Sequence, residues 1–206
     1  CCIDDNEEAL LWRLRMIGTA RESIVLSTFD LRADENGTKL LAALNCAASR
    51  GVKIQLLIDG IYQQLFLAGS SDFQALSSYD NVEVGVYNPV TPANLFKVNY
   101  RMHDKYLIVD EKMYLLGGRN SNDIFLGDQT KGINVDRDIL VYDTSGGQGE
   151  SLQQIEDYFH KIWKESCVSI KKGKKSSKDA DAYRHMEEIY AALLKKYNDI
   201  ETYSAW

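Results

Sequence analysis

Near the start of the chain a strand, a helix and a second strand follow one another with short connections, and this order constrains the fold most. Ser23–Phe29 and Val52–Ile58 are short runs rich in β-branched and aliphatic side chains, which favours buried strands. Between them, Gly37–Arg50 places leucines and alanines at helical spacing and ends at Gly51. Strands joined through a helix pair in parallel by a right-handed crossover. We therefore predict an α/β domain.

Further strands and helices extend this unit. A helix is predicted from residue 7 to about residue 21, with Asp4 or Asn6 as its N-cap. The other predicted strands are residues 82–86, 106–109, 113–116 and 139–142, and the other predicted helices are residues 73–78, 151–165 and 180–198. Together they predict a mixed, largely parallel sheet with helices on both faces and a C-terminal helical extension.

A change in composition predicts a boundary near residue 168. Residues 161–178 contain seven lysines and one acid, Glu165, although the whole chain has a net charge of −6. We predict a compact domain over residues 1–168, followed by a Lys/Ser linker and a connecting helix over residues 169–206. The lysines are either a solvated linker or a patch that approaches anionic phospholipid.

Composition narrows the class of protein. No run of 18 or more apolar residues is present, so no membrane-spanning segment is predicted. The four cysteines lack the spacing of a zinc site or a disulfide framework, and we predict neither metal nor cofactor. The chain begins with Cys1 rather than Met, from which we expect a trimmed or processed form.

The segment from His103 to Asn120 concentrates side chains suited to phosphate chemistry. His103 and Lys105 are two residues apart on a predicted extended segment, so both project to the same side. A neutral imidazole can attack phosphorus, and an ammonium group can hold a non-bridging phosphate oxygen. The amide of Asn120 can hydrogen-bond another phosphate oxygen.

Other residues of this segment have supporting roles. Asp110 follows a predicted strand, where its carboxylate can organise the local backbone. Gly117 and Gly118 allow either a close approach of another group or a positive φ. Arg119, like Arg101, either adds positive potential for a phosphate or pairs with a nearby acid.

The spacing H-x-K-x4-D-x6-G-G-x-N resembles the signature of the phospholipase D superfamily at every defining position. The resemblance extends over most of the predicted domain and is to the amino-terminal half of bacterial cardiolipin-synthase-like proteins. Outside the signature it is carried by Ser27–Leu31, Gly37–Gly51, Leu56–Asp59, Val135–Ile139 and the aromatic residues Tyr158, Phe159 and Trp163.

The resemblance implies a metal-independent, two-step transfer. One histidine forms a covalent phosphohistidine, and a second histidine, from a second copy of the motif, protonates the leaving alcohol. His103 matches one of the two, with nucleophile preferred over acid. Asp136, ahead of Asp138, is the candidate to hold its other ring nitrogen, and Asp110 has a structural or orienting role. The implied substrate-binding residues are Lys105, Gly118, Arg119 and Asn120.

The chain carries a single copy of this motif. His160 and His185 lie in helical patterns without the accompanying lysine, aspartate or glycines. A second half-site must therefore come from a missing C-terminal domain, which we favour, or from a homodimer partner. Without it we expect the chain to be inactive or nearly so.

Three functions compete. The leading hypothesis is a phosphatidyltransferase or phospholipase acting on phospholipid at a bacterial membrane surface, with an anchor upstream of Cys1; a cytoplasmic location is the alternative. A nuclease should present a basic groove with aromatic side chains, and the acidic body argues against nucleic acid as partner. The third hypothesis is a non-catalytic half that supports a partner domain.

Overall fold

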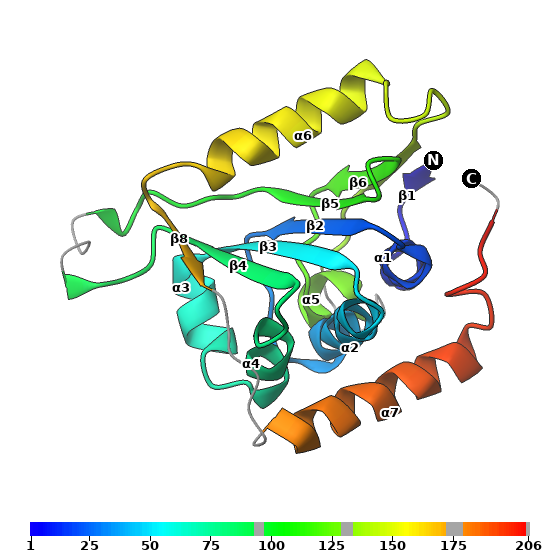
Figure 1. Cartoon of the computed structure of the whole chain (residues 1–206), viewed down its shortest axis with the longest axis horizontal. Helices are drawn as coiled ribbons and strands as arrows, with labels where there is room; N and C mark the ends of the chain where they lie inside the picture. Colours follow the sequence, from blue (N-terminus) through cyan, green and yellow to red (C-terminus); the bar gives the residue numbers. More distant parts are fainter. Residues whose placement is uncertain (93–96, 129–133, 172–178, 205–206) are drawn as a thin grey trace.

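Eight strands form one mixed sheet in the computed structural model, which describes residues 1–92, 97–128, 134–171 and 179–204 (Figure 1). Their order across the sheet is β1-β7-β6-β5-β2-β3-β4-β8. The strands are β1 (Cys2–Ile3), β2 (Ser23–Thr28), β3 (Lys53–Asp59), β4 (Val82–Tyr87), β5 (Lys105–Val109), β6 (Met113–Gly117), β7 (Asp138–Tyr142) and β8 (Val168–Lys171).

The predicted mixed α/β sheet and its parallel crossover are confirmed, but the expectation of a largely parallel sheet is wrong. Strand β3 pairs in parallel with β2 and β4, whereas the other neighbouring strands of the described sheet are antiparallel. A parallel connection needs about a dozen residues or more. Only residues 110–112 separate β5 from β6, so these two strands must form a hairpin.

Helices cover both faces of the sheet, as predicted. Figure 1 shows α6 alone on one face, with α2, α4 and α7 on the other. The described helices are α1 (Asn6–Thr19), α2 (Glu35–Ser49), α3 (Gly60–Tyr62) continued by the π-helix η1 (Gln63–Leu67), α4 (Ser71–Ser77), α5 (Asp123–Leu126), α6 (Glu150–Trp163) and α7 (Ala180–Lys196). None of them combines the length and apolarity that a membrane crossing needs.

Aspartates set the starts of the first two long helices. Asp5 accepts a hydrogen bond from the backbone N–H of Glu8, and Asp34 accepts one from Gly37. A carboxylate at this position satisfies an N–H that the helix leaves unpaired. The N-cap of α1 is therefore Asp5, between the two predicted candidates Asp4 and Asn6.

Two hydrophobic cores lie on opposite faces of the sheet. The larger one joins the sheet to α1, α2, α4 and α7, and includes Met186, Tyr190 and Leu193 of the last helix. The smaller core lies under α6 and contains Phe159 and Trp163 together with sheet residues of β3 and β5. The two cores fix the sheet between its helical layers.

The last part of the chain packs closely on the sheet and α2. The predicted boundary at residue 168 coincides with the first residue of β8, an edge strand paired with β4. Helix α7 shares the core of α2. Most of the predicted Lys/Ser linker, residues 172–178, lies outside the described residues.

Asp110 ties the β5–β6 turn to the start of β2. Its carboxylate accepts hydrogen bonds of 2.7–3.1 Å from the backbone N–H groups of Arg21, Glu22 and Ser23. Asp110 itself has a φ of 55°, which Asp and Asn tolerate better than most residues. The carboxylate therefore holds the α1–β2 connection against the turn.

We expect Asp110→Asn to lower the free energy of unfolding by about 2 kcal/mol, because one amide oxygen cannot replace two carboxylate oxygens for three N–H donors. Urea denaturation measures this loss. Glu111→Gln is the matched control, since Glu111 is exposed and has a φ of 51°, and it should change stability by less than about 0.5 kcal/mol. An equal change in the free energy of unfolding for both variants would show that the hydrogen bonds of the Asp110 carboxylate do not stabilise the fold.

Candidate active site

The predicted residues His103, Lys105 and Asn120 lie at one end of the sheet. Lys105 is the first residue of β5, opposite Thr28 of β2. The chain beyond β6 returns along the end of β2, where the N–H of Ser121 donates to the carbonyl of Asp30 at 3.0 Å. This return places Asn120 beside the ends of β2 and β5.

His103 and Lys105 contact each other directly. The Lys105 ammonium lies 2.8 Å from the carbonyl oxygen of His103 and 3.2 Å from its Nδ1 atom. The imidazole is exposed, whereas Lys105 is only 7% exposed. The site therefore combines an accessible imidazole with a shielded positive charge.

Phe29 supports both groups, a role that the sequence analysis missed. Its ring centroid lies 4.6 Å from that of the His103 imidazole and 5.5 Å from the Lys105 ammonium. An aromatic face attracts a cation at such distances. Phe29 follows β2 directly, so the sheet sets its position.

Burial lowers the pKa of the Lys105 ammonium below its ordinary value of 10.5. The negative charges of Asp104, Asp136 and Asp30 offset part of this effect. Desolvation penalises the charged form of a buried lysine, and an anionic ligand would restore the lost stabilisation. Lys105 is thus poised to bind an anion.

Asn120 is buried, and its Oδ1 atom has no hydrogen-bond partner among the described residues. A buried polar atom without a partner costs about 1–3 kcal/mol. An amide can be turned over to offer an N–H at the same place. In that orientation the side chain would present a donor to a phosphate oxygen.

Gly117 and Gly118 make room for two carboxylates. A Cβ on Gly118 would lie 2.0 Å from Oδ2 of Asp136, and one on Gly117 would lie 1.9 Å from Oδ1 of Asp138. Neither glycine has a positive φ. Of the two roles considered for the glycine pair, close approach is therefore the one that the structure shows. Gly118 contacts Asp136, and its role toward substrate stays a prediction.

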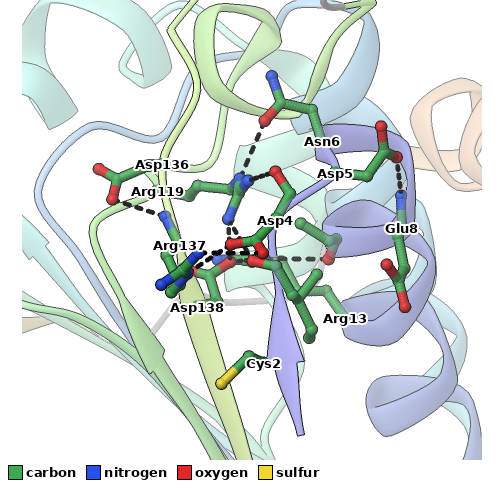
Figure 2. Close-up of polar contacts among 12 residues, drawn as sticks. Cys2, Asp4, Asp5, Asn6, Glu8, Arg13, Arg119, Asp136, Arg137 and Asp138 are labelled. Atoms are coloured by element: carbon green, nitrogen blue, oxygen red, sulfur yellow. Dashed lines mark hydrogen bonds and ion pairs between the residues drawn. The ribbon is translucent and has the colours of Figure 1, made fainter.

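Asp138, Arg13 and Arg119 form a buried ion cluster next to the loop that carries Asn120 (Figure 2). Oδ2 of Asp138 is 2.9 Å from Arg13 and 3.4 Å from Arg119. Arg119 also donates to the side chain of Asn6 and to the carbonyls of Ile3 and Asp4. The cluster joins the N-terminal segment, α1, β7 and the loop that carries Asn120.

This cluster corrects two predicted roles. Arg119 has a fully buried side chain that is occupied by the N-terminal segment, so the prediction that it binds substrate is wrong. Asp138 is fully buried between two arginines, so it is not free to hold the ring of His103. Both corrections have one cause, since a buried charge requires a charged or hydrogen-bonding partner.

Asp136 and Asp110 occupy different places relative to the site. Asp136 is partly exposed, and its charge acts on Lys105. Its Oδ1 accepts a hydrogen bond from the N–H of Arg137. Asp110 follows the opposite end of β5, about 16 Å from Lys105 at the usual rise of a strand. Asp136 therefore remains the candidate to orient His103, and Asp110 acts on the fold.

The other two histidines lie elsewhere. His160 is exposed in the last turn of α6. His185 of α7 contacts the carboxylate of Asp72 at 3.0 Å and thereby links α7 to α4.

Arg101, near the site, pairs with Asp59 at 3.1 Å. Through the described ranges, no group of three or more His, Cys, Asp or Glu residues could hold a metal ion.

The chain matches a known protein family and several curated proteins. Residues 14–163 match the family described as cardiolipin synthase, PLD-like domain. Cardiolipin synthase C of Escherichia coli is 27% identical over 178 residues, which cover 82% of this chain and 35% of that protein. The chain spans between 35% and 42% of the length of the first curated relatives that it matches.

Solved structures share the fold. NucT from Helicobacter pylori has a TM-score of 0.62 and 22% identity, with 82% of this chain and 97% of that chain covered. A phosphatidylserine synthase from Haemophilus influenzae has a TM-score of 0.63 and 14% identity, with 94% and 43% covered. At these identities the likeness concerns the fold alone.

We expect Arg119→Met to lower the free energy of unfolding by about 3 kcal/mol, because it removes one cation from the buried carboxylate of Asp138. Arg137→Met is the matched control. Arg137 pairs with Asp4 at the surface, where an ion pair contributes at most about 1 kcal/mol. Urea denaturation compares the two variants. A loss that is equal for both would contradict a structural role for the buried cluster.

We expect the affinity for sulfate to fall as pH rises, with the fall beginning at a lower pH than for a lysine with the ordinary pKa of 10.5. The lowered pKa means that Lys105 loses its proton, and its attraction for the anion, earlier than an exposed lysine. Sulfate remains a dianion over this range, so its own charge does not change. Lys105→Arg should remove the decline, because Arg stays protonated. A decline that persists in Lys105→Arg would assign it to another group.

Proposed function

This chain belongs to the cardiolipin synthase, PLD-like domain family, and from that membership we propose that it supplies one of two half-sites for phosphodiester cleavage or transfer on phospholipids. The observation that carries the proposal is the contact of the exposed His103 imidazole with the shielded Lys105 ammonium, at the end of the sheet to which the loop with the buried Asn120 amide returns. These groups supply a nucleophile, a cation and a hydrogen-bond donor for one phosphate.

The reaction proceeds in two displacements. A ring nitrogen of His103 attacks phosphorus, the N–P bond forms, and the bond from phosphorus to the leaving oxygen breaks. That oxygen takes a proton from a second histidine. Water or an alcohol then gives a proton to the second histidine and attacks phosphorus, which breaks the N–P bond and frees His103. Lys105 and Asn120 hold the non-bridging oxygens throughout.

Asp136 is the proposed orienting acid for His103. A carboxylate on the second ring nitrogen fixes the tautomer and stabilises the imidazolium. In the present arrangement Nδ1 of His103 contacts Lys105 instead. A bound phosphate would compete for that ammonium, and we propose that the imidazole then turns toward Asp136.

The second half-site comes from a partner of the same fold. This can be a further domain of a longer protein or a second copy of the chain. The first curated relatives are more than twice as long as this chain, which favours the further domain. A purely supporting role for this half is less favoured, because His103, Lys105 and Asn120 are all present.

Phospholipid is the proposed substrate, and a bacterial membrane surface is the proposed location, with the cytoplasm as the alternative. The family description and the cardiolipin synthase relatives support this choice. The alternative is a nuclease, since structural neighbours include a protein named NucT. A chain with net charge −6 lacks the overall positive field that attracts nucleic acid.

We expect a cleavage assay with excess chelator to show turnover only in fractions that contain two half-sites, with molar mass measured by light scattering. In these fractions His103→Ala should lower the rate by at least about 10³-fold, and Asn120→Ala by about 10²-fold. His160→Ala is the matched control and should keep full activity, since His160 lies outside the site.

Two substrates separate the alternatives in that assay. A short-chain anionic phospholipid should be cleaved or transferred faster than a single-stranded oligonucleotide. The reverse preference, lost in His103→Ala, would replace the phospholipid proposal by the nuclease. Turnover that survives His103→Ala would reject the site itself.

A further inference from the structure

A groove adjoins the site on the face of the sheet that α6 covers. Its volume is about 380 Å³, and Asp104 and Lys105 are among its lining residues. The walls are formed largely by aromatic and aliphatic side chains from β5, β6 and α6, namely Tyr106, Tyr114, Leu116, Ile155 and Tyr158. Cavities of this size with apolar walls and few polar groups are typical of small-molecule sites.

The groove leads away from the phosphate-binding groups. Tyr158 donates a hydrogen bond of 2.8 Å to Asp104 at the site end. Ser151, seven residues earlier on α6, lines the groove about 10 Å away along the helix. On the sheet, Leu116 lies opposite Tyr106, and Tyr114 lies opposite Ile108 two residues further along.

The sheet face beside the groove is incompletely covered. Leu116 is 45% exposed, although its strand β6 lies between β5 and β7 rather than at the edge. Its cross-strand neighbour Ile139 is exposed as well. Exposed apolar residues that adjoin one another on a protein surface often mark an interaction surface or a ligand-binding groove, whereas single scattered ones are normal.

Resting on the proposed phospholipid chemistry, we propose that this groove binds an acyl chain of the phosphatidyl group whose phosphate lies at Lys105. The groove begins at Asp104 and Lys105, beside His103, and its body is apolar. Apart from Asp104 and Lys105, its lining residues carry no charge. A nucleic-acid strand would need further cations along its path, so the walls favour a hydrocarbon chain.

The test compares two ligands on the full 206-residue chain. Dihexanoyl phosphatidylglycerol, kept below its aggregation concentration, is titrated beside its deacylated counterpart glycerophosphoglycerol, with binding followed by calorimetry and NMR. We expect the acylated ligand to bind at least about tenfold more tightly, the effect of burying roughly two methylene groups. NMR shifts should appear at Leu116 and Ile155.

Substitutions at Leu116 assign the gain to the groove. Leu116→Gln makes the wall polar, and Leu116→Trp fills the groove, so both should remove the tenfold preference for the acylated ligand. Ile170→Gln is the matched control, because Ile170 on β8 is 47% exposed and lies outside the groove lining. It should keep the preference. Far-ultraviolet circular dichroism and urea denaturation establish that each variant is folded.

Several results would overturn the inference. The first two are equal affinity for the two ligands and a preference for the acylated ligand that survives Leu116→Trp. The third is binding in the groove by a dinucleotide but not by the acylated ligand. The fourth is a Leu116→Gln variant that changes only the self-association of the chain and leaves ligand affinity unchanged. The proposed function fails separately. Acyl-dependent binding without any His103-dependent cleavage, even with a second half-site, would reject the chemistry and retain the groove. His103-dependent cleavage without acyl-dependent binding would reject the groove and retain the proposed chemistry.

Discussion

The buried carboxylate of Asp138, held between Arg13 and Arg119, is the interaction on which the site depends. Isolating these charges from water is costly, and only close pairing and further hydrogen bonds offset that cost. Arg119 obtains such bonds from the N-terminal segment. The cluster therefore fixes the loop of Gly117–Asn120 against β7 and α1. The same loop carries Asn120 back to the end of β2, where Ser121 donates to the carbonyl of Asp30.

Much of the fold was predictable because its central elements are long and periodic. The β2–α2–β3 crossover follows from hydrophobic spacing and from the handedness rule. The short elements β1, α5 and β8 were missed, since two to four residues carry no measurable period. The direction of the later strands was also misjudged, because pairing direction depends on connection length rather than on strand composition.

Within the site, contacts between residues close in sequence were predictable, whereas roles that depend on distant residues were not. His103 and Lys105 are neighbours in sequence, so their meeting required only an extended backbone. The roles of Arg119 and Asp138 depended on partners more than 100 residues away, such as Asn6 and Arg13, which local sequence cannot reveal. Phe29 was missed for the same reason, as its contact with His103 exists only once β2 and β5 are paired.

The most direct test of the central claim is to detect phosphorus bound to His103. An aryl phosphodiester releases a weakly basic leaving group that needs little protonation, so a single half-site should react without a second histidine. After an alkaline quench and proteolysis, mass spectrometry should find the adduct on His103 and none in His103→Ala. An adduct on His160 or His185, or turnover of the ester with no adduct on His103, would contradict the account.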